Sequence, residues 1–423
     1  MRYLLAITFA TGAIAQENPM DLLHRVQASA AASADRIARY MCTETVDRSQ
    51  YKPDGHDLLS SACDTAEKPD THLVVTDRLR LEVTMGGALE MYSWIGEKRF
   101  NDRDLGEMVR DGAISTGSFA SLLGAIFQDA TASFTYNGDS TFEGRTVSEF
   151  GFTVPLERSG YTFGKDLHAV NTGFGGTFLV DPATAELLHI EQATNRLPSQ
   201  TQACEASTTL DYARAQVKGI DLLLPRLAVL RITHPDGGYS ENRMVFTNCH
   251  EFNATSKLSF DAPADSRVTQ PVEKTPLTIP IGQRFQVVFL DGIDTSTAAG
   301  GDPLKARLAT PIHLAGNIVL ESGTNISARI VRVRQYANPA PWVEFEIKLE
   351  RIDYKGAWID LVARPDWKSI AFEVKKSKTQ LTRRVDLGIL SALAERSMPF
   401  VFRNVKLPFQ VAGGLESHWI TSK

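Results

Sequence analysis

Strict alternation of apolar and polar residues is the pattern that most limits what this chain can fold into. Between residues 78 and 85 every second residue is apolar, from Leu79 to Met85, and the residues between them are polar or charged. Because successive side chains of a β-strand point to opposite faces, this pattern predicts a strand with one buried face. A Gly-Gly turn follows, and residues 89–94 are expected to return as the second strand of a hairpin.

Strand patterns dominate the rest of the chain, with turn residues between them. In the first part they cover residues 40–46, 133–136, 147–154, 176–180, 187–191, 208–217, 222–233 and 238–246. In the second part they cover residues 284–289, 325–333 and 343–349, with hairpin turns at 316–317 and 355–356 and a closing strand pair within residues 407–421. The spacing predicts a mainly β chain whose second part is a small all-β domain.

Two segments have helical periodicity instead. Residues 21–34 repeat apolar residues at helical spacing and are rich in alanine. Residues 119–127 place their apolar side chains on one continuous stripe, and Ser118 can cap the N-terminus of this helix. Such a stripe needs an apolar partner, so we expect this second helix to be buried.

The first fifteen residues have the features of a secretory signal peptide. Arg2 gives a positive start, residues 3–12 are mostly apolar, and Ala13 begins a small-x-small pattern that predicts cleavage between Ala15 and Gln16. A membrane anchor is the alternative, but the apolar run is about a dozen residues against the roughly 20 that span a bilayer. We therefore expect an exported protein, periplasmic or extracellular, with no transmembrane segment in the mature chain.

Length and one Pro-rich segment divide the chain into domains. A chain of 423 residues is too long for one ordinary core, even after removal of a leader. Residues 261–280 contain four prolines in a polar stretch without periodicity, which is typical of a linker. We expect a signal peptide over residues 1–15, a first domain over residues 16–260 and a second over residues 281–423.

The chain has four cysteines, Cys42, Cys63, Cys204 and Cys249. An even number in an exported protein predicts disulfides, and three pairings are compatible with four cysteines. Proximity in sequence favours Cys42 with Cys63 and Cys204 with Cys249. A zinc site is the rival interpretation, but the sequence has no CxxC or HxxxH element, so we expect no metal.

Charge and motifs exclude several functions. The net charge is −5, which gives no electrostatic reason to expect nucleic acid as a partner. His250-Glu251 begins a zinc-protease pattern that lacks its second histidine. Ser49 and Lys52 match the Ser-x-x-Lys motif, but they lie in a turn-rich stretch and not on the helix that this motif requires. Nucleotide-binding glycine loops and the nucleophile elbow are absent. We expect no cofactor, no catalytic residues and a protein that is not an enzyme; a hydrolase is the least favoured hypothesis.

The segment at residues 175–184, Gly-Gly-Thr-Phe-Leu-Val-Asp-Pro-Ala-Thr, followed by Leu-Leu-His-Ile at 187–190, carries a family resemblance. It resembles the strand, Asp-Pro-x-Thr turn and strand of the bacterial lipoprotein carrier and lipoprotein-sorting superfamily. The resemblance covers roughly residues 20–260. It implies a half-open antiparallel β-barrel with an amphipathic helix.

The second part of the chain resembles another family. Residues 279–285, 295–298, 301–306 and 318–324 are similar to the small β-domain of conjugal-transfer channel proteins, over residues 279–363. The membrane segment of that family is absent, so pore formation is not implied. As a whole, the chain is similar to uncharacterised exported bacterial proteins that join these two parts.

Aromatic side chains on or beside strands of the first domain suggest where a ligand would bind. They either form a packed core under the helix at 119–127, or leave an apolar cavity wide enough for acyl chains. The candidate lining is Phe119, Leu123, Phe127, Phe134, Tyr136, Phe150, Phe152 and Phe178. The leading hypothesis is a non-catalytic envelope protein that binds a lipid or other hydrophobic ligand. The alternative is a structural or adaptor protein that contacts envelope protein partners.

Overall fold

A computed structural model describes residues 18–55, 63, 69–97, 100, 105–109, 111–128, 131–164, 169–252, 279–314, 318–337, 340–366 and 397–422. The expected leader, with its cleavage site between Ala15 and Gln16, lies outside the described residues. So do most of the expected linker at 261–280 and the turn expected at 316–317. Buried apolar side chains form two clusters, one from Leu22 to Phe246 and one from Phe285 to Trp419. We call residues 18–252 the first lobe and residues 279–422 the second lobe.

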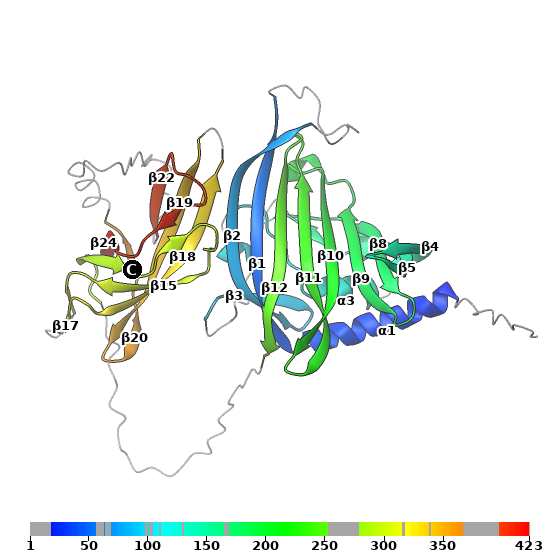
Figure 1. Cartoon of the computed structure of the whole chain (residues 1–423), viewed down its shortest axis with the longest axis horizontal. Coiled ribbons are helices and arrows are strands. Elements are labelled where there is room, and N and C mark those ends of the chain that lie inside the picture. The colour runs from blue at the N-terminus through cyan, green and yellow to red at the C-terminus, as the bar shows by residue number, and fades with distance from the viewer. Residues whose placement is uncertain are drawn as a thin grey trace, which may run out of the picture.

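The first lobe is a wide antiparallel sheet with helices (Figure 1). Its strands follow the order β4-β5-β8-β9-β10-β11-β12-β1-β2-β3. Their bounds are β1 Tyr40–Pro53, β2 Thr71–Gly86, β3 Leu89–Trp94, β4 Ser133–Phe142, β5 Arg145–Val154, β8 Phe174–Asp181, β9 Glu186–Thr194, β10 Glu205–Val217, β11 Ile220–Thr233 and β12 Tyr239–Glu251. A short ribbon of β6 Thr162–Phe163 and β7 Val170–Asn171 lies apart from this sheet. The strands expected from sequence in this part of the chain are confirmed.

Among the described residues, three α-helices accompany this sheet: α1 Pro19–Ile37, α2 Leu105–Met108 and α3 Ser121–Phe127. Asn18 caps α1 by accepting a hydrogen bond from the Met20 N–H at 3.0 Å, and Pro19 occupies the first turn, where no N–H donor is needed. The apolar side of α1 packs against α3, β9 and β11, along the lower ends of the strands in Figure 1. The helix expected over residues 21–34 is therefore confirmed.

The sheet of the first lobe is strongly curled. Ten strands spaced about 4.8 Å apart would make a flat sheet on the order of 43 Å wide. Yet α3, seven residues and therefore roughly 10 Å long, contacts both edge strands. The Ser121 N–H lies 3.3 Å from Glu90 of β3, and the Phe127 ring centroid lies 6.2 Å from that of Phe134 of β4. No described pairing joins β3 to β4, so the curled sheet is not closed into a barrel.

The second lobe is built from short strands around a second core. Its main strands follow the order β21-β24-β13-β15-β18-β19, and β19 pairs with both β20 and β22. Their bounds are β13 Arg284–Phe289, β15 Pro303–Leu308, β18 Asn325–Tyr336, β19 Trp342–Tyr354, β20 Ala357–Asp360, β21 Ala363–Pro365, β22 Met398–Arg403 and β24 Leu415–Thr421. Two minor pairs are β14 Ile293–Asp294 with β23 Gln410–Val411, and β16 Ile312–His313 with β17 Val319–Leu320. The closing strand pair expected within residues 407–421 is wrong, because β23 and β24 each pair with a strand distant in sequence.

Strand β2 joins the two lobes into one hydrogen-bonded sheet. One edge of β2 pairs with β1 along most of its length. The other edge pairs with β18 at Val75 to Asp77 and with β3 from Leu81 onward. Between these stretches, the Arg80 N–H donates to the Gly300 carbonyl at 2.8 Å. The second lobe therefore continues the sheet of the first.

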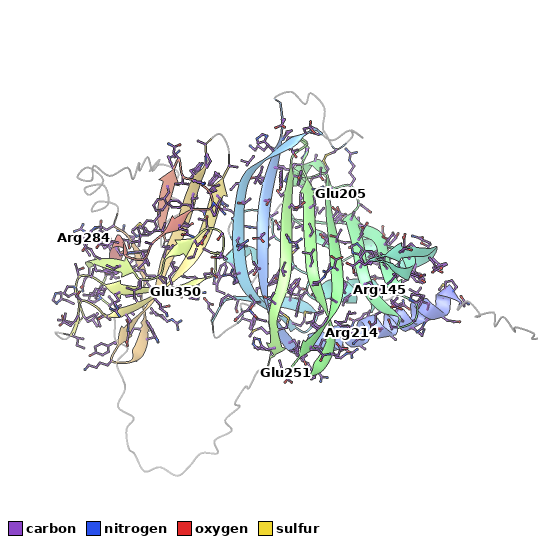
Figure 2. All side chains as sticks on the ribbon, viewed as in Figure 1. Arg145, Glu205, Arg214, Glu251, Arg284 and Glu350 are labelled. Carbon is purple, nitrogen blue, oxygen red and sulfur yellow. A yellow bond between two sulfur atoms is a disulfide. The ribbon has the colours of Figure 1, made fainter. Side chains whose placement is uncertain are left out.

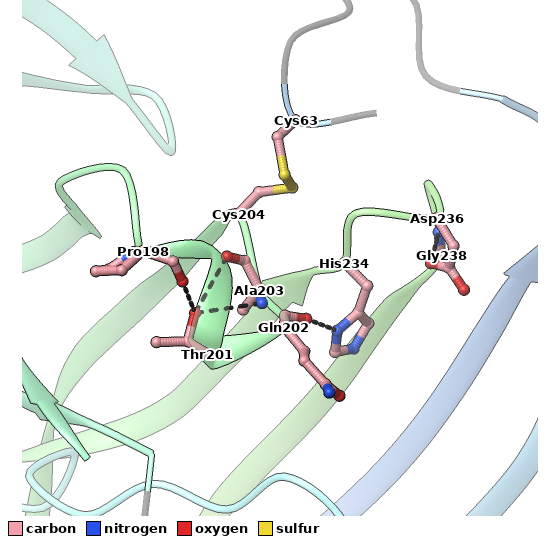
Figure 3. Close-up of a disulfide and its surroundings, with 9 residues drawn as sticks. All are labelled: Cys63, Pro198, Thr201, Gln202, Ala203, Cys204, His234, Asp236 and Gly238. Atoms are coloured by element: carbon pink, nitrogen blue, oxygen red, sulfur yellow. Dashed lines mark hydrogen bonds between the residues drawn. A yellow bond between two sulfur atoms is a disulfide. The ribbon is translucent and has the colours of Figure 1, made fainter. Parts of the chain in front are cut away.

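Both disulfides exist, but their expected pairing is wrong. Cys42 of β1 bonds Cys249 of β12, with Cα atoms 4.0 Å apart on neighbouring strands. Cys63 bonds Cys204 across 5.3 Å, and Figure 3 shows this bridge beside the turn in which Thr201 donates to the Pro198 carbonyl. The strands explain the error. Cys42 lies near the start of β1, and the chain reaches Cys63 only after the strand's other end, about 36 Å away at 3.3 Å per residue.

We predict that the Cys42–Cys249 bridge contributes about 4 kcal/mol to the free energy of unfolding. The inner bridge already shortens the path between these cysteines to about 66 residues, the difference between the two sequence separations. Closing a loop of that size restricts the unfolded chain by about 4 kcal/mol in the chain-entropy model. Urea unfolding of the Cys42→Ala/Cys249→Ala double variant measures the loss. Non-reducing peptide maps that join Cys42 to Cys63 would contradict the assignment.

Candidate functional site

The aromatic residues singled out from sequence form one packed cluster inside the curled sheet. Phe178 of β8 is its centre, with ring centroids 5.1 Å from Phe127 and 5.4 Å from Phe150. Phe134 and Phe152 surround the same ring at 6.0 and 6.2 Å. These are the separations of aromatic rings in direct contact. The interior is therefore filled by the protein's own side chains.

The remaining three candidates lie around this cluster. Leu123 is buried on α3, and Phe119 is buried just before the helix, where its ring lies 5.7 Å from that of Phe246 of β12. Tyr136 differs, because it lies on edge strand β4 and is 36% exposed, although its ring contacts Phe150 at 5.3 Å. The structure thus brings all eight candidates to one region. That they bind a ligand stays a prediction.

We call residues 105–109 and 111–128, which carry α2 and α3, the cover. Four apolar side chains of α3 face the sheet, Leu122, Leu123, Ile126 and Phe127. Around them the cover is fixed to the sheet by polar contacts at two places.

The first attachment is the carboxylate of Glu90 on β3. Its Oε1 accepts hydrogen bonds from the backbone N–H groups of Phe119 and Ala120, both at 2.9 Å, and from Ser121 at 3.3 Å. Its Oε2 accepts from the Gly117 N–H at 2.7 Å. The helix expected over residues 119–127 begins instead at Ser121, and its N-cap residue Ala120 makes no side-chain cap. The expected Ser118 cap is wrong, because a carboxylate from a distant strand satisfies the free N–H groups.

The second attachment is Arg48 of β1. Its guanidinium forms a two-pronged ion pair with Asp77 of β2, with both contacts at 2.6 Å and both side chains 8% exposed. Its Nη1 also donates to the Asp111 carbonyl of the cover at 2.7 Å. Asn242 of β12, opposite Arg48 in the sheet, donates to the Ala113 carbonyl at 2.8 Å. Side chains of three neighbouring strands therefore meet beside Asp111 and Ala113, between α2 and α3.

Glu44 of β1 is the unusual group on this inner face. It is 2% exposed, lies opposite Leu81 and Phe246 in the sheet, and its Oε2 has no hydrogen-bond partner. Burial raises the pKa of the Glu44 carboxyl well above its ordinary value, and the negative charge of Glu90 raises it further. Burial likewise raises the pKa of Tyr92, and the charges of Glu90 and Glu44 add to that shift. The interior thus holds a buried carboxyl that releases its proton less readily than an exposed glutamate does.

A cavity of about 210 Å³ lies at the joint between the lobes. Its charged lining residues already pair with one another, Arg48 with Asp77 and Arg78 with Asp47 at 2.5 Å. Because these four charged side chains neutralise one another, none of them is free to pair with a charged ligand.

The motifs weighed from sequence do not assemble into reactive sites. Ser49 and Lys52 both lie on β1, where residues three apart point to opposite faces, so Lys52 is not placed to take a proton from Ser49. Within the described part of the chain, no three His, Cys, Asp or Glu side chains converge as metal ligands. Among the helices that the structure describes, none is both long enough and apolar enough to cross a membrane.

Glu44, Arg48, Glu90 and Asp111 were missed by the sequence reasoning. Two of them carried a signal. Alternation along residues 40–48 places Glu44 and Arg48 at positions that face inward with Tyr40, Cys42 and Val46. A charged residue at an inward position marks a buried polar contact, although the pattern does not name its partner.

Comparisons with known proteins give a structural likeness without a family. No protein-family model matches the chain, and no curated protein matches it. A solved "putative outer membrane lipoprotein-sorting protein domain" from Vibrio parahaemolyticus is similar over 57% of this chain and 96% of that chain, at 13% identity and a TM-score of 0.30. A DUF1329 family protein from Desulfovibrio piger is similar over 58% and 98%, at 10% identity and a TM-score of 0.27. The resemblance of residues 20–260 to lipoprotein carriers and that of residues 279–363 to channel proteins both stay predictions.

We predict that Glu44→Gln stabilises the protein increasingly as the pH rises above about 4.5, the ordinary carboxyl value in the unfolded chain. The folded protein keeps Glu44 protonated at pH values where the unfolded chain has released that proton, so its contribution to stability is lost as pH rises toward the raised pKa. The variant lacks this loss. The free energies of unfolding of the variant and the unchanged protein, measured from pH 4 to 8, should be similar near pH 4. Near pH 8 the variant should be more stable, by an amount on the order of 1 kcal/mol.

The control for this experiment is Glu82→Gln on neighbouring strand β2. Glu82 is half-buried and accepts a hydrogen bond from Ser93 at 3.2 Å. Equal pH profiles for both variants would contradict the role given to Glu44.

We also predict that Glu90→Ala lowers the free energy of unfolding by about 3 kcal/mol, because several buried N–H donors lose a charged acceptor. Hydrogen exchange should rise most at residues 117–128, which the Glu90 carboxylate holds. Glu82→Ala is the matched control, with an expected loss below about 1 kcal/mol. Unchanged exchange at 117–128 in Glu90→Ala would show that this carboxylate does not hold the cover.

Proposed function

We propose that this chain is an exported, non-catalytic protein of the cell envelope whose first lobe binds a long acyl chain in the place that α3 occupies in the described structure. The observation that carries the proposal is the construction of the interior. The short helix α3 places Phe127 against Phe178, which packs in turn on Phe150 and Phe152, while α1 covers the nearby strands β9 and β11. An apolar ligand that displaces α3 would reach the apolar surface around Phe178.

Two features support the assignment to the envelope. Both pairs of cysteines are disulfide-bonded, which is typical of proteins that work in oxidising compartments. The expected leader, with cleavage between Ala15 and Gln16, agrees with export. Whether the compartment is the periplasm or the cell exterior is decided by fractionation of the host.

Burial free energies determine which ligands can compete with the cover. The four buried side chains of α3 contribute roughly 6 to 12 kcal/mol, at about 1.5 to 3 kcal/mol each. An acyl chain gains about 0.8 kcal/mol per buried methylene, so roughly eight to fifteen methylenes offset the loss of α3. The ligand class is therefore long-chain lipid or fatty acid, and chains shorter than about eight carbons should not bind.

A second function is favoured by the close packing of the same rings, which lie 5.1 to 6.2 Å apart in the described state. If the cover never leaves, the first lobe is solid and the protein acts through its outer surface. It would then be a structural or adaptor protein with envelope protein partners. Ligand recovery distinguishes the two, because an adaptor purified from its host would carry no lipid in native mass spectrometry.

We predict that Gly124→Ala weakens acyl-chain binding about fivefold. Alanine stabilises a helix interior by about 1 kcal/mol relative to glycine, so the variant holds α3 more firmly in the closed state. The added methyl group would meet only the end of the flexible Gln128 side chain, at 3.1 Å. Fluorescence titration with cis-parinaric acid, an eighteen-carbon fatty acid, measures the affinity, and competition with eight- to eighteen-carbon fatty acids measures the length threshold.

The control is Gly160→Ala, whose added methyl group meets nothing within 4 Å and which lies outside the cover. Its affinity should equal that of the unchanged protein. Tighter binding in Gly124→Ala, or binding with no dependence on chain length, would contradict displacement of α3. Failure of every fatty acid to bind would favour the adaptor function.

A further inference from the structure

The second lobe contacts the cover through ion pairs with Asp111. The Asp111 carboxylate accepts a hydrogen bond from Arg332 Nη1 at 2.6 Å, and Arg334 Nη2 lies 3.5 Å from the same oxygen. Both arginines are on β18, the strand that continues the sheet from β2. One residue of the cover therefore carries contacts that cross from one lobe to the other.

The first lobe holds the same point from the opposite side. Arg48 donates to the Asp111 carbonyl, and Arg334 Nε lies 3.6 Å from the Asp77 carboxylate that pairs with Arg48. Gly112 makes this contact fit, because its φ is +85° and a Cβ there would lie 2.9 Å from Arg48 Nη1. Asp111, which lies between α2 and α3 in the cover, is thus contacted by three arginines, two of which belong to the second lobe.

Burial of the partners shows that this attachment can be reversed. The Arg48–Asp77 pair is 8% exposed on both sides, whereas the Asp111 side chain is 38% exposed against 16% for Arg332. Arg332 also keeps two acceptors within its own lobe, Glu344 at 2.9 Å and Glu346 at 3.0 Å. Releasing Asp111 therefore leaves Arg332 ion-paired through Nη2, while Nη1 exchanges its carboxylate acceptor for water.

We propose that Arg332 and Arg334 of the second lobe latch the cover closed through Asp111, so that the second lobe controls access to the inner face of the first. This inference rests on the proposed function and adds its regulation. A change that withdraws β18 from the cover, such as a partner bound to the second lobe or screening by salt, raises the fraction of molecules with the inner face open. The ligand then displaces α3 from the inner face more readily.

Hydrogen exchange in the full chain tests the latch without any ligand. Asp111→Asn keeps the size of the side chain and removes its charge, and Asp111 is exposed enough for the variant to fold. Losing an ion pair of this exposure should speed exchange of residues 113–128 about fivefold. In the unchanged protein, 0.5 M salt should speed the same amides, because partly exposed ion pairs are screened, and the variant should not respond.

The matched control is Asp302→Asn, which breaks the ion pair between Asp302 of the second lobe and Arg80 of the first. It removes one carboxylate across the same joint without touching the cover. Exchange at residues 113–128 should stay at the level of the unchanged protein. Equal exchange in the two variants, or no change in Asp111→Asn, would overturn the latch.

A second measurement separates the latch from the proposed function. The association rate of cis-parinaric acid should rise about fivefold in Asp111→Asn and remain unchanged in Asp302→Asn. If no variant binds the fatty acid, the binding function fails while the exchange data still decide whether the latch exists. If binding occurs at one rate in all three proteins, the latch does not regulate access and the inference is overturned.

Discussion

Strand β2 holds the two lobes together, because both of its edges form backbone hydrogen bonds along its length. On one side it continues the curled sheet through β1, and on the other it meets β18, residue 300 and β3 in turn. A strand in this position is fixed in register by two lobes at once. The charged side chains beside it, with Arg48 paired to Asp77 and Arg80 to Asp302, can therefore lie at low exposure with defined partners. Arg329 extends the same joint, since it pairs with Glu350 of β19 and donates to the Ile95 carbonyl of the first lobe.

The interior of the first lobe combines two kinds of attachment with different physical character. Burial of apolar side chains is non-directional and would allow α3 to slide along the sheet. The Glu90 carboxylate accepts hydrogen bonds from successive backbone N–H groups, and such bonds define one position and one orientation. Apolar packing holds the cover, and polar contacts determine where it sits.

Elements with local causes could be predicted from the sequence, and contacts between distant segments could not. The alternation at residues 78–85 and the apolar stripe of α3 each follow from spacing along the chain, and both are confirmed. The partner of Cys42 depends on which strand lies beside β1, and proximity in sequence points to the wrong cysteine. The cap of α3 depends on Glu90, which lies far from the helix in sequence. The aromatic cluster was predicted as a group because most of its members lie on or beside predicted strands, while the latch at Asp111 required the fold of both lobes.

The outer disulfide also determines how the protein would respond to mechanical force. Cys42 and Cys249 join the first strand of the first lobe to its last, and Figure 2 shows Glu251 at the lower end of β12, close to where the chain leaves this lobe. Tension applied to the two ends of the chain passes through that covalent bond and bypasses the 207-residue loop between the cysteines. Once the contacts of β18 with β2 and Asp111 have separated, the curled sheet, its cover and the inner disulfide carry no load. A protein tethered between two envelope structures could thus be stretched at its second lobe while the first stays folded.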